Sequence, residues 1–207
     1  RKSNLNKINN NLNPKGITMQ KIIAIMKNGL SFQEWTENID IDLQSNQCFD
    51  SKNLSKYGRL YTYAGALEVL KQVDPNHSDG WRLPTVQDFE NLKSVNDVLL
   101  KDASGSWKSN KNGLEKRNQK SQDFSALPAG YKTPRAQSSK DDEFTAFFWI
   151  DDQLYEGPGT SKYAMELNYC NPGMFLTSQD KRNFFSVRLV RDPKNAPSKS
   201  NSEETGE

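Results

Sequence analysis

The feature that most constrains the fold is a group of three strand-like segments in the last third of the chain, at residues 144–150, 163–169 and 184–190. The first is rich in aromatic residues, which favour strands, and the other two alternate in polarity. A period of two residues places the apolar side chains of a strand on one face. Because these strands cluster instead of alternating with helices, they predict an α+β fold with an antiparallel sheet.

Two helices are predicted before these strands. The first covers about residues 62–72 and ends before Pro75. The second begins at Thr85, with Asp88 three residues later as a variant capping box. Its apolar residues recur every three or four positions, which predicts a helix through about Leu100.

Composition divides the chain into one folded unit and two polar ends. Residues 1–16 are rich in Asn and Lys and predict a flexible lead-in, and residues 193–207 are Pro/Ser/Glu-rich and predict a disordered tail. The domain is therefore expected over residues 17–192, with a strand or a short helix over 17–26. The sequence contains no apolar run long enough to span a membrane. Because the chain begins at Arg1, we expect an upstream segment, which could be a signal or lipoprotein leader or simply more protein.

The charge pattern argues against nucleic acid as a partner. The net charge is +2, yet residues 1–21 hold five basic and no acidic side chains, and residues 101–120 hold six basic and two acidic. The rest of the domain is therefore acidic. Nucleic-acid binding calls for one continuous basic face, and this distribution predicts solvated basic loops instead.

Few residues are available for metal binding or catalysis. Cys48 and Cys170 could form a disulfide or remain separate buried thiols. With only two cysteines and one histidine, His77, the chain has too few ligands for a Cys/His zinc site. A Ser-His or Cys-His catalytic site would have to use the same histidine as its base. No cofactor is expected, although Asp151 with Asp152, or the acidic residues 141–143, could bind calcium weakly.

Several motifs occur together in a fixed order. They are Trp35-Thr36-Glu37-Asn38, Tyr57-Gly58-Arg59-Leu60-Tyr61, Gly80-Trp81-Arg82-Leu83-Pro84-Thr85 with Asp88-Phe89, Phe124-Ser125-Ala126-Leu127-Pro128-Ala129-Gly130-Tyr131, Phe148-Trp149, and Phe185 to Asp192. Over residues 32–192 they resemble the Fibrobacter succinogenes major paralogous domain. The chain departs from that pattern at residues 76–79, where relatives commonly have Cys-Pro, and at 150–152, where many have Ser-Ser.

The resemblance implies a C-type lectin-like domain, with two helices flanking a small antiparallel sheet that carries long loops. That family is similar to the formylglycine-generating enzyme group and to retroelement-diversified variable proteins. Its members are typically secreted or surface proteins of Bacteroidetes-like bacteria, often lipoproteins, so a lipid anchor upstream of Arg1 is consistent with it. Trp81, Pro84, Arg188 and Arg191 are expected to be structural, with each arginine paired to a nearby acid.

The candidate recognition surface is the polar and aromatic stretch between residues 151 and 183. Such side chains, on loops held by a rigid sheet, suit adaptable binding. The candidate ligand-binding residues are Asp151, Asp152, Tyr155, Tyr163, Asn168, Tyr169, Asn171, Gln179, Asp180, Arg182 and Asn183. The sequence thus predicts a non-catalytic, secreted or surface-displayed module that recognises a protein or a glycan.

Three alternatives stay open at this point. The chain could be a retroelement-diversified receptor-binding protein of a phage or bacterium. It could be an oxidase of the formylglycine-generating type that uses Cys170 together with Cys48. It could also be a structural protein of an envelope or phage-tail assembly.

Overall fold

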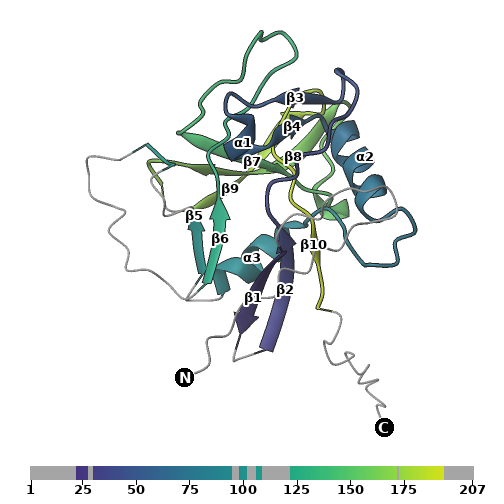
Figure 1. The fold of residues 1–207 in the computed structure, drawn as a ribbon, viewed down its shortest axis with the longest axis vertical. Helices are drawn as coiled ribbons and strands as arrows, with labels where there is room; N and C mark the ends of the chain where they lie inside the picture. The colour runs from purple at the N-terminus through teal and green to yellow at the C-terminus, as the bar shows by residue number, and fades with distance from the viewer. Residues whose placement is uncertain are drawn as a thin grey trace.

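The protein is represented by a computed structural model that describes residues 22–27, 30–94, 98–101, 106–108, 122–171 and 173–193. The predicted lead-in and nearly all of the predicted tail lie outside these ranges. In chain order the elements are β1 (Ile22–Lys27), β2 (Leu30–Thr36), β3 (Cys48–Asp50), α1 (Leu54–Tyr57), β4 (Arg59–Tyr61), α2 (Tyr63–Val73), α3 (Val86–Ser94), β5 (Val98–Lys101), β6 (Gln122–Ala126), β7 (Thr145–Trp149), the 3-10 helix η1 (Gln153–Tyr155), β8 (Ser161–Asn168), β9 (Met174–Asp180) and β10 (Val190–Arg191) (Figure 1).

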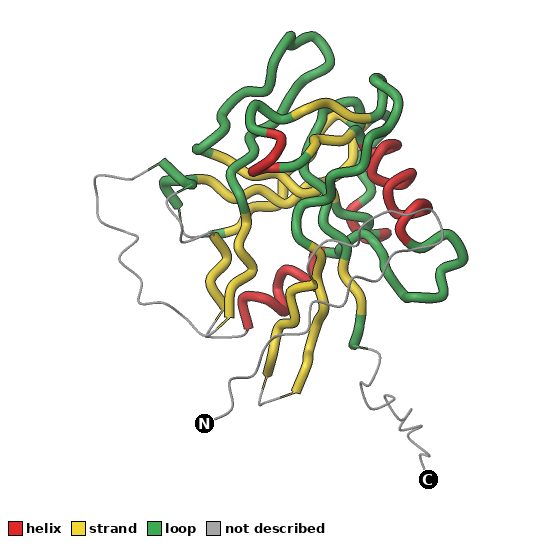
Figure 2. The backbone as a smooth tube through the Cα atoms, viewed as in Figure 1, coloured by secondary structure: helices red, strands yellow, loops and turns green. Residues whose placement is uncertain are grey.

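The described strands form small sheets rather than one large one. Their orders are β1-β2-β10, β3-β4, β5-β6 and β7-β8-β9. All strand pairs are antiparallel except β5 with β6, which is parallel and was not predicted. Figure 2 shows that loops make up much of the described chain, including the long connection between β6 and β7. The fold is therefore α+β with few helices and small sheets, as the sequence predicts.

Strand β7 is buried on both of its faces. Phe148 and Ala146 pack in one core cluster, which also contains Phe89 of α3. Phe147 and Trp149 point the other way, into a second cluster that contains Val69 of α2. Because neighbouring residues of a strand face opposite sides, α2 and α3 must cover opposite faces of the β7-β8-β9 sheet. This arrangement confirms two helices flanking a small antiparallel sheet.

The starts of both long helices follow the capping signals in the sequence. The Thr62 side chain accepts a hydrogen bond from the Gly65 backbone and caps α2. At α3, the Asp88 carboxylate accepts from the Thr85 backbone N–H at 2.8 Å, and Thr85 Oγ1 accepts from Asp88 N at 3.3 Å, which completes the predicted capping box. Burial opposes ionisation of Asp88, but hydrogen bonds from Arg82 and Thr85 outweigh it and lower the pKa of this carboxyl.

The second helix is shorter than its apolar spacing predicts. Helix α3 ends at Ser94, and residues 98–101 form β5, which pairs in parallel with β6. Asn96 and Asp97 lie between the two elements in the sequence, and such side chains compete with helical backbone hydrogen bonds. The prediction that the helix continues to about Leu100 is therefore wrong. Pairing with β6, which is distant in the sequence, makes residues 98–101 a strand.

The last predicted strand is extended but pairs with several partners in turn. Within residues 184–190, Phe185 bridges Tyr61 and Ser186 bridges Phe148, and only β10 at its end forms a regular strand pair, with β2. The predicted alternation is confirmed, since Phe185, Val187 and Leu189 are all buried in the α2-side cluster. The segment therefore passes between separate sheets and pairs with each neighbouring strand over only one or two residues.

The Asp88→Ala substitution should lower the free energy of unfolding by about 2–3 kcal/mol, because it removes a cap and leaves Arg82 without its carboxylate. Urea denaturation measures this loss. The matched control is Glu90→Ala on the same helix, where an exposed pair with Lys93 is removed and the change should stay within about 0.5 kcal/mol. Equal losses in the two variants would contradict the role given to Asp88.

The contribution of Asp88 should depend on pH in a defined direction. Its folded-state pKa lies below the ordinary 3.8, so its stabilisation is present above the unfolded pKa and is lost as pH falls through the folded value. The stability difference between wild type and Asp88→Asn should therefore be constant at neutral pH and shrink below about pH 4. Denaturation curves recorded between neutral and acidic pH test this, and a difference that grows on acidification would contradict it.

Candidate functional site

Strand pairing distributes the predicted binding residues between two ends of the β7-β8-β9 sheet. Trp149 pairs with Ala164, and Ser161 pairs with Asp180, so the end of β7, the start of β8 and the end of β9 lie together. We call this end the sheet-end surface. It contains the predicted residues Asp151, Asp152, Tyr155, Tyr163, Gln179, Asp180, Arg182 and Asn183, together with Tyr63, Leu154, Glu156 and Lys162.

Three predicted residues lie at the opposite end of the sheet. Asn168 is the last residue of β8, and Tyr169 and Asn171 follow it. The seven steps from Ser161 to Asn168 correspond to about 23 Å of strand. Tyr169 packs against the Phe144 ring, and Asn171 Oδ1 accepts a hydrogen bond from Gly173 N at 2.8 Å. The eleven predicted residues therefore do not form one continuous surface.

Asp152 fixes the loop between β7 and β8. One carboxylate oxygen accepts a hydrogen bond from Leu154 N at 3.0 Å and so caps η1. The other accepts from Val86 N at 3.1 Å, at the start of α3. Because the side chain is buried and both its oxygens are engaged, Asp152 holds the loop in place instead of facing a ligand.

A buried lysine lies beneath the same loop. Lys162 Nζ is 3.0 Å from Asp151 Oδ1 and 3.7 Å from Glu156 Oε1, and it lies over the ring of Tyr63. The Tyr63 hydroxyl donates to Asp151 Oδ1 at 2.8 Å. Burial, with the neighbouring Asp151 carboxylate, raises the pKa of Tyr63. These contacts tie the loop to α2 and to β8.

The outer part of the loop exposes apolar side chains. Leu154 is 88% exposed and Tyr155 is 38% exposed, although both belong to the fixed helix η1. The Tyr155 ring meets the edge of Tyr163 at a centroid distance of 5.9 Å. Sequence reasoning missed Leu154, yet an apolar residue between Asp152 and Tyr155 in an otherwise polar loop was a signal for it.

Arg182 and Asp180 form a forked ion pair at the end of β9. Arg182 donates through Nε and NH2, with NH2 at 2.6 Å from Asp180 Oδ2, and its side chain is still 72% exposed. The hydrogen bonds from Arg182 lower the pKa of Asp180 to about 2. Asn183 donates to Gln179 Oε1 at 3.2 Å beside this pair. The sheet-end surface thus combines fixed aromatic and charged groups.

The two cysteines are both free, so the disulfide considered from the sequence is not formed. Cys48 is buried and hydrogen-bonded to the Leu43 backbone, and burial raises the pKa of its thiol. Cys170 is exposed beyond the end of β8. Among the described residues no group of three or more His, Cys, Asp or Glu side chains could hold a metal ion. Of the carboxylates considered for calcium, Asp151, Asp152 and Asp142 are engaged by protein groups.

Comparison with known protein families now adds to this geometry. The family model of the Fibrobacter succinogenes major domain matches residues 8–191. The chain belongs to this family. No significant match was found among curated proteins or among solved structures. The family description names a domain and no activity, so the function of this Fibrobacter succinogenes major domain has to be argued from its surfaces.

Within the described ranges, no helix combines the length and the apolar character that crossing a membrane requires.

The Asp152→Ala substitution should loosen η1 without unfolding the domain. It removes two hydrogen bonds to backbone N–H groups, at a cost of about 1–2 kcal/mol. Hydrogen–deuterium exchange should become faster in peptides that cover residues 150–160. The control is Gln153→Ala in the same loop, whose exposed side chain should leave exchange unchanged. Unaltered exchange in Asp152→Ala would show that other contacts hold the loop.

Proposed function

We propose that this protein is a non-catalytic ligand-binding module that recognises a protein or a glycan through the sheet-end surface. The observation that carries the proposal is the pair Leu154 and Tyr155, which stay exposed although Asp152 fixes their helix at two points. An exposed leucine alone needs no explanation. Held by Asp152 at the same end of the sheet as the Tyr155–Tyr163 contact and the Asp180–Arg182 pair, this leucine belongs to a preformed contact surface.

Preorganisation favours binding because it reduces the entropy lost on association. A fixed tyrosine supplies contact area with few rotatable bonds, and a guanidinium supplies directional donors. The Tyr155–Tyr163 contact and the Asp180–Arg182 fork provide these two elements at one end of the sheet. A flexible loop of the same composition would have to be ordered on binding.

Charge pairing at this surface supports binding over catalysis. A general acid or base works best with a pKa near the working pH and access to substrate. Asp151 is bound by Lys162 and Tyr63, and Arg182 lowers the pKa of Asp180 to about 2, which makes Asp180 a weak base. Both carboxylates act here as fixed acceptors that orient their neighbours.

The architecture supports a C-type lectin-like domain as the finer description of the fold. Two helices on opposite faces of the β7-β8-β9 sheet, with long loops, agree with that arrangement. We propose by the same resemblance that the module acts outside the cell or at its surface. Its ligand would then belong to another protein or to a surface glycan.

Alanine substitution at Tyr155 and Arg182 should weaken binding at least tenfold, or about 1.4 kcal/mol per tenfold change. The ligand is first identified on arrays of glycans and of surface proteins, and affinity is then measured by surface plasmon resonance. Thermal melting should stay near wild type, because both side chains are partly or largely exposed.

The matched control is Tyr169→Ala, an aromatic truncation at the opposite end of the sheet. It should leave affinity unchanged in the same assay. Loss of binding in Tyr169→Ala together with retention in the Tyr155/Arg182 variant would place recognition at the wrong end and overturn the proposal.

A further inference from the structure

A cleft separate from the sheet-end surface lies beside α1. It has a volume of about 380 Å³ and is bounded by residues 37–40, by residues 54–58 and by Ser125 and Leu127, with Arg188 in its lining. This volume falls in the range of about 300–1,000 Å³ that is usual for small-molecule sites. We propose that the cleft binds a single neutral sugar unit. None of its lining residues belongs to the sheet-end surface, so the two proposals are independent.

The wall of the cleft at Arg188 is rigid. Arg188 is 1% exposed, and its guanidinium donates to Asn38 Oδ1 at 2.8 Å, to Ser125 O at 2.7 Å and to the Phe124 carbonyl. It also lies 4.5 Å from the Phe124 ring centroid. Asn38 in turn donates to the Tyr57 carbonyl at 3.0 Å, which links this wall to α1. The sequence predicted acidic partners for Arg188, whereas these acceptors are an amide and two carbonyls.

The charges that line the cleft balance. The charged residues of the lining are two acids, Glu37 and Asp40, and two bases, Lys56 and Arg188, so the lining has no formal net charge. The carboxylates would repel an anionic ligand, and the basic groups would repel a cationic one. A neutral ligand that both donates and accepts hydrogen bonds fits such a mixed lining, because hydrogen bonds to charged groups are stronger than those between neutral groups.

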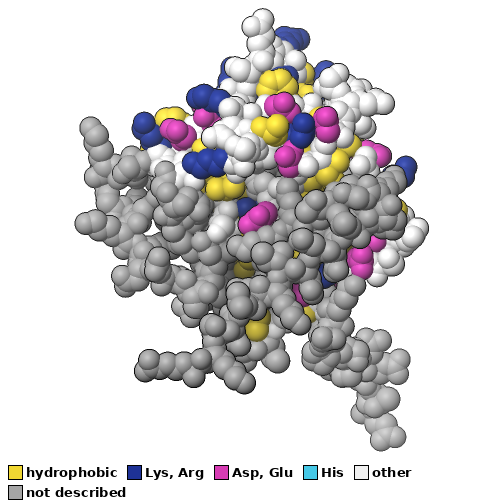
Figure 3. All heavy atoms as spheres, viewed as in Figure 1, with side chains coloured by type: hydrophobic (Ala, Val, Ile, Leu, Met, Phe, Trp, Pro, Cys, Tyr) yellow, Lys and Arg dark blue, Asp and Glu magenta, His cyan; other side chains and the backbone are white. Residues whose placement is uncertain are grey.

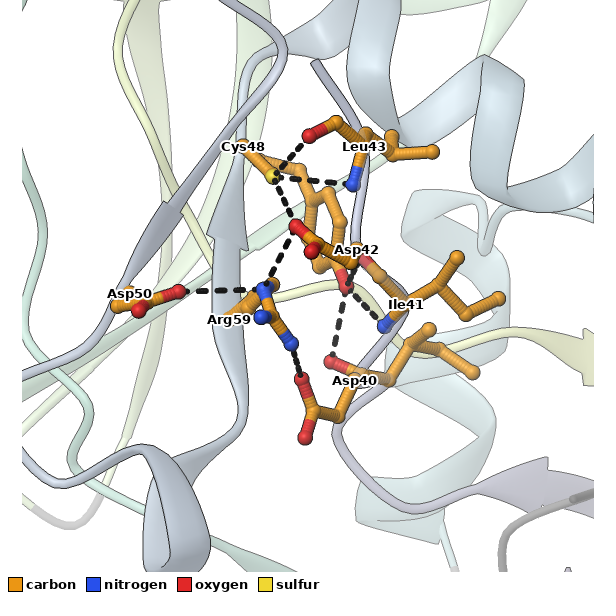
Figure 4. Close-up of polar contacts among 9 residues, drawn as sticks. Asp40, Ile41, Asp42, Leu43, Cys48, Asp50 and Arg59 are labelled. Atoms are coloured by element: carbon orange, nitrogen blue, oxygen red, sulfur yellow. Dashed lines mark hydrogen bonds and ion pairs between the residues drawn. The ribbon is translucent and has the colours of Figure 1, made fainter. Parts of the chain in front are cut away.

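The neighbouring surface disfavours anionic ligands further. Arg59 pairs with Asp40, Asp42 and Asp50, so a single guanidinium faces three carboxylates (Figure 4). The side chains of Asp42 and Asp50 are 79% and 64% exposed and add negative potential near the cleft. Figure 3 shows acidic and basic side chains interspersed on the upper part of the face in view. Phosphorylated and acidic sugars are therefore poorer candidates than neutral ones.

Apolar side chains complete the lining. Leu54 and Leu127 are half-buried and Tyr57 is buried at the cleft. A pyranose presents hydroxyl groups at its rim and C–H groups on its faces, so it needs both polar and apolar contacts. Ser55 and Ser125 add hydroxyls to the same lining. A neutral pyranose matches this combination better than an inorganic ion, which has no apolar face.

Saturation-transfer NMR with methyl glycosides of glucose, galactose, mannose and N-acetylglucosamine tests the proposal on the whole chain. At least one neutral glycoside should give a signal, and glucuronate should bind more weakly. Ser55→Trp, which places a large ring at an exposed lining position, should reduce affinity about tenfold or more. Lys56→Ala, a milder change at the same helix, should reduce it several-fold.

The control is Ser138→Trp, the same substitution at an exposed serine outside the cleft, and it should bind as wild type does. The Tyr155/Arg182 double alanine variant should also keep this binding, which separates the cleft from the sheet-end surface. Silence from every neutral glycoside would overturn the proposal. Preference for glucuronate, or full binding in both Ser55→Trp and Lys56→Ala, would do the same.

Discussion

The structure depends on a strand that is buried on both faces. Alternate side chains of β7 enter two separate cores, one closed by α3 and the other by α2. Trp149 links β7 to neighbouring segments in the second core. Its indole N–H donates to the Tyr61 carbonyl at 2.7 Å, and the centroids of its ring and the Phe185 ring are 4.6 Å apart. A polar residue at either face of this strand would be buried without water, which explains its aromatic sequence.

The chain from Phe184 to Arg191 joins the separate sheets into one unit. It bridges Tyr61, then Phe148, and finally pairs with Trp35 of β2. Arg188 lies in the middle of this passage and donates hydrogen bonds to the backbone carbonyls of residues 124 and 125 in β6. Arg191 shows the expected structural pairing, with Glu34 at 2.7 Å, and also covers the Trp81 ring. The same network that holds the sheets together forms the rigid wall of the cleft.

The two candidate binding surfaces arise from different kinds of support. The sheet-end surface is a loop fixed from below, in which Asp152 holds η1 and Lys162 holds Asp151. The cleft forms between segments far apart in the sequence, where Asn38, Tyr57 and Arg188 are linked by hydrogen bonds. Both surfaces lie within the residues that match the family model.

The sequence by itself determined the features that depend on near neighbours. It placed the start of α2 near Thr62, the Thr85–Asp88 capping box, and the shared face of Phe185, Val187 and Leu189, because caps and periodicity act over a few residues. It also named most of the sheet-end residues, through the polar and aromatic composition of residues 151–183, which the structure divides among η1, β8, β9 and their connections.

Only the tertiary structure decided which of those residues meet. The register of β8 with its neighbours places Asn168, Tyr169 and Asn171 at the far end of the sheet. Parallel pairing with β6 makes residues 98–101 a strand, although their apolar spacing predicts a helix. The cleft could not be predicted, because it requires residues 38, 57 and 188 to converge. Register and convergence depend on pairing between distant segments, and local sequence patterns carry little information about that pairing.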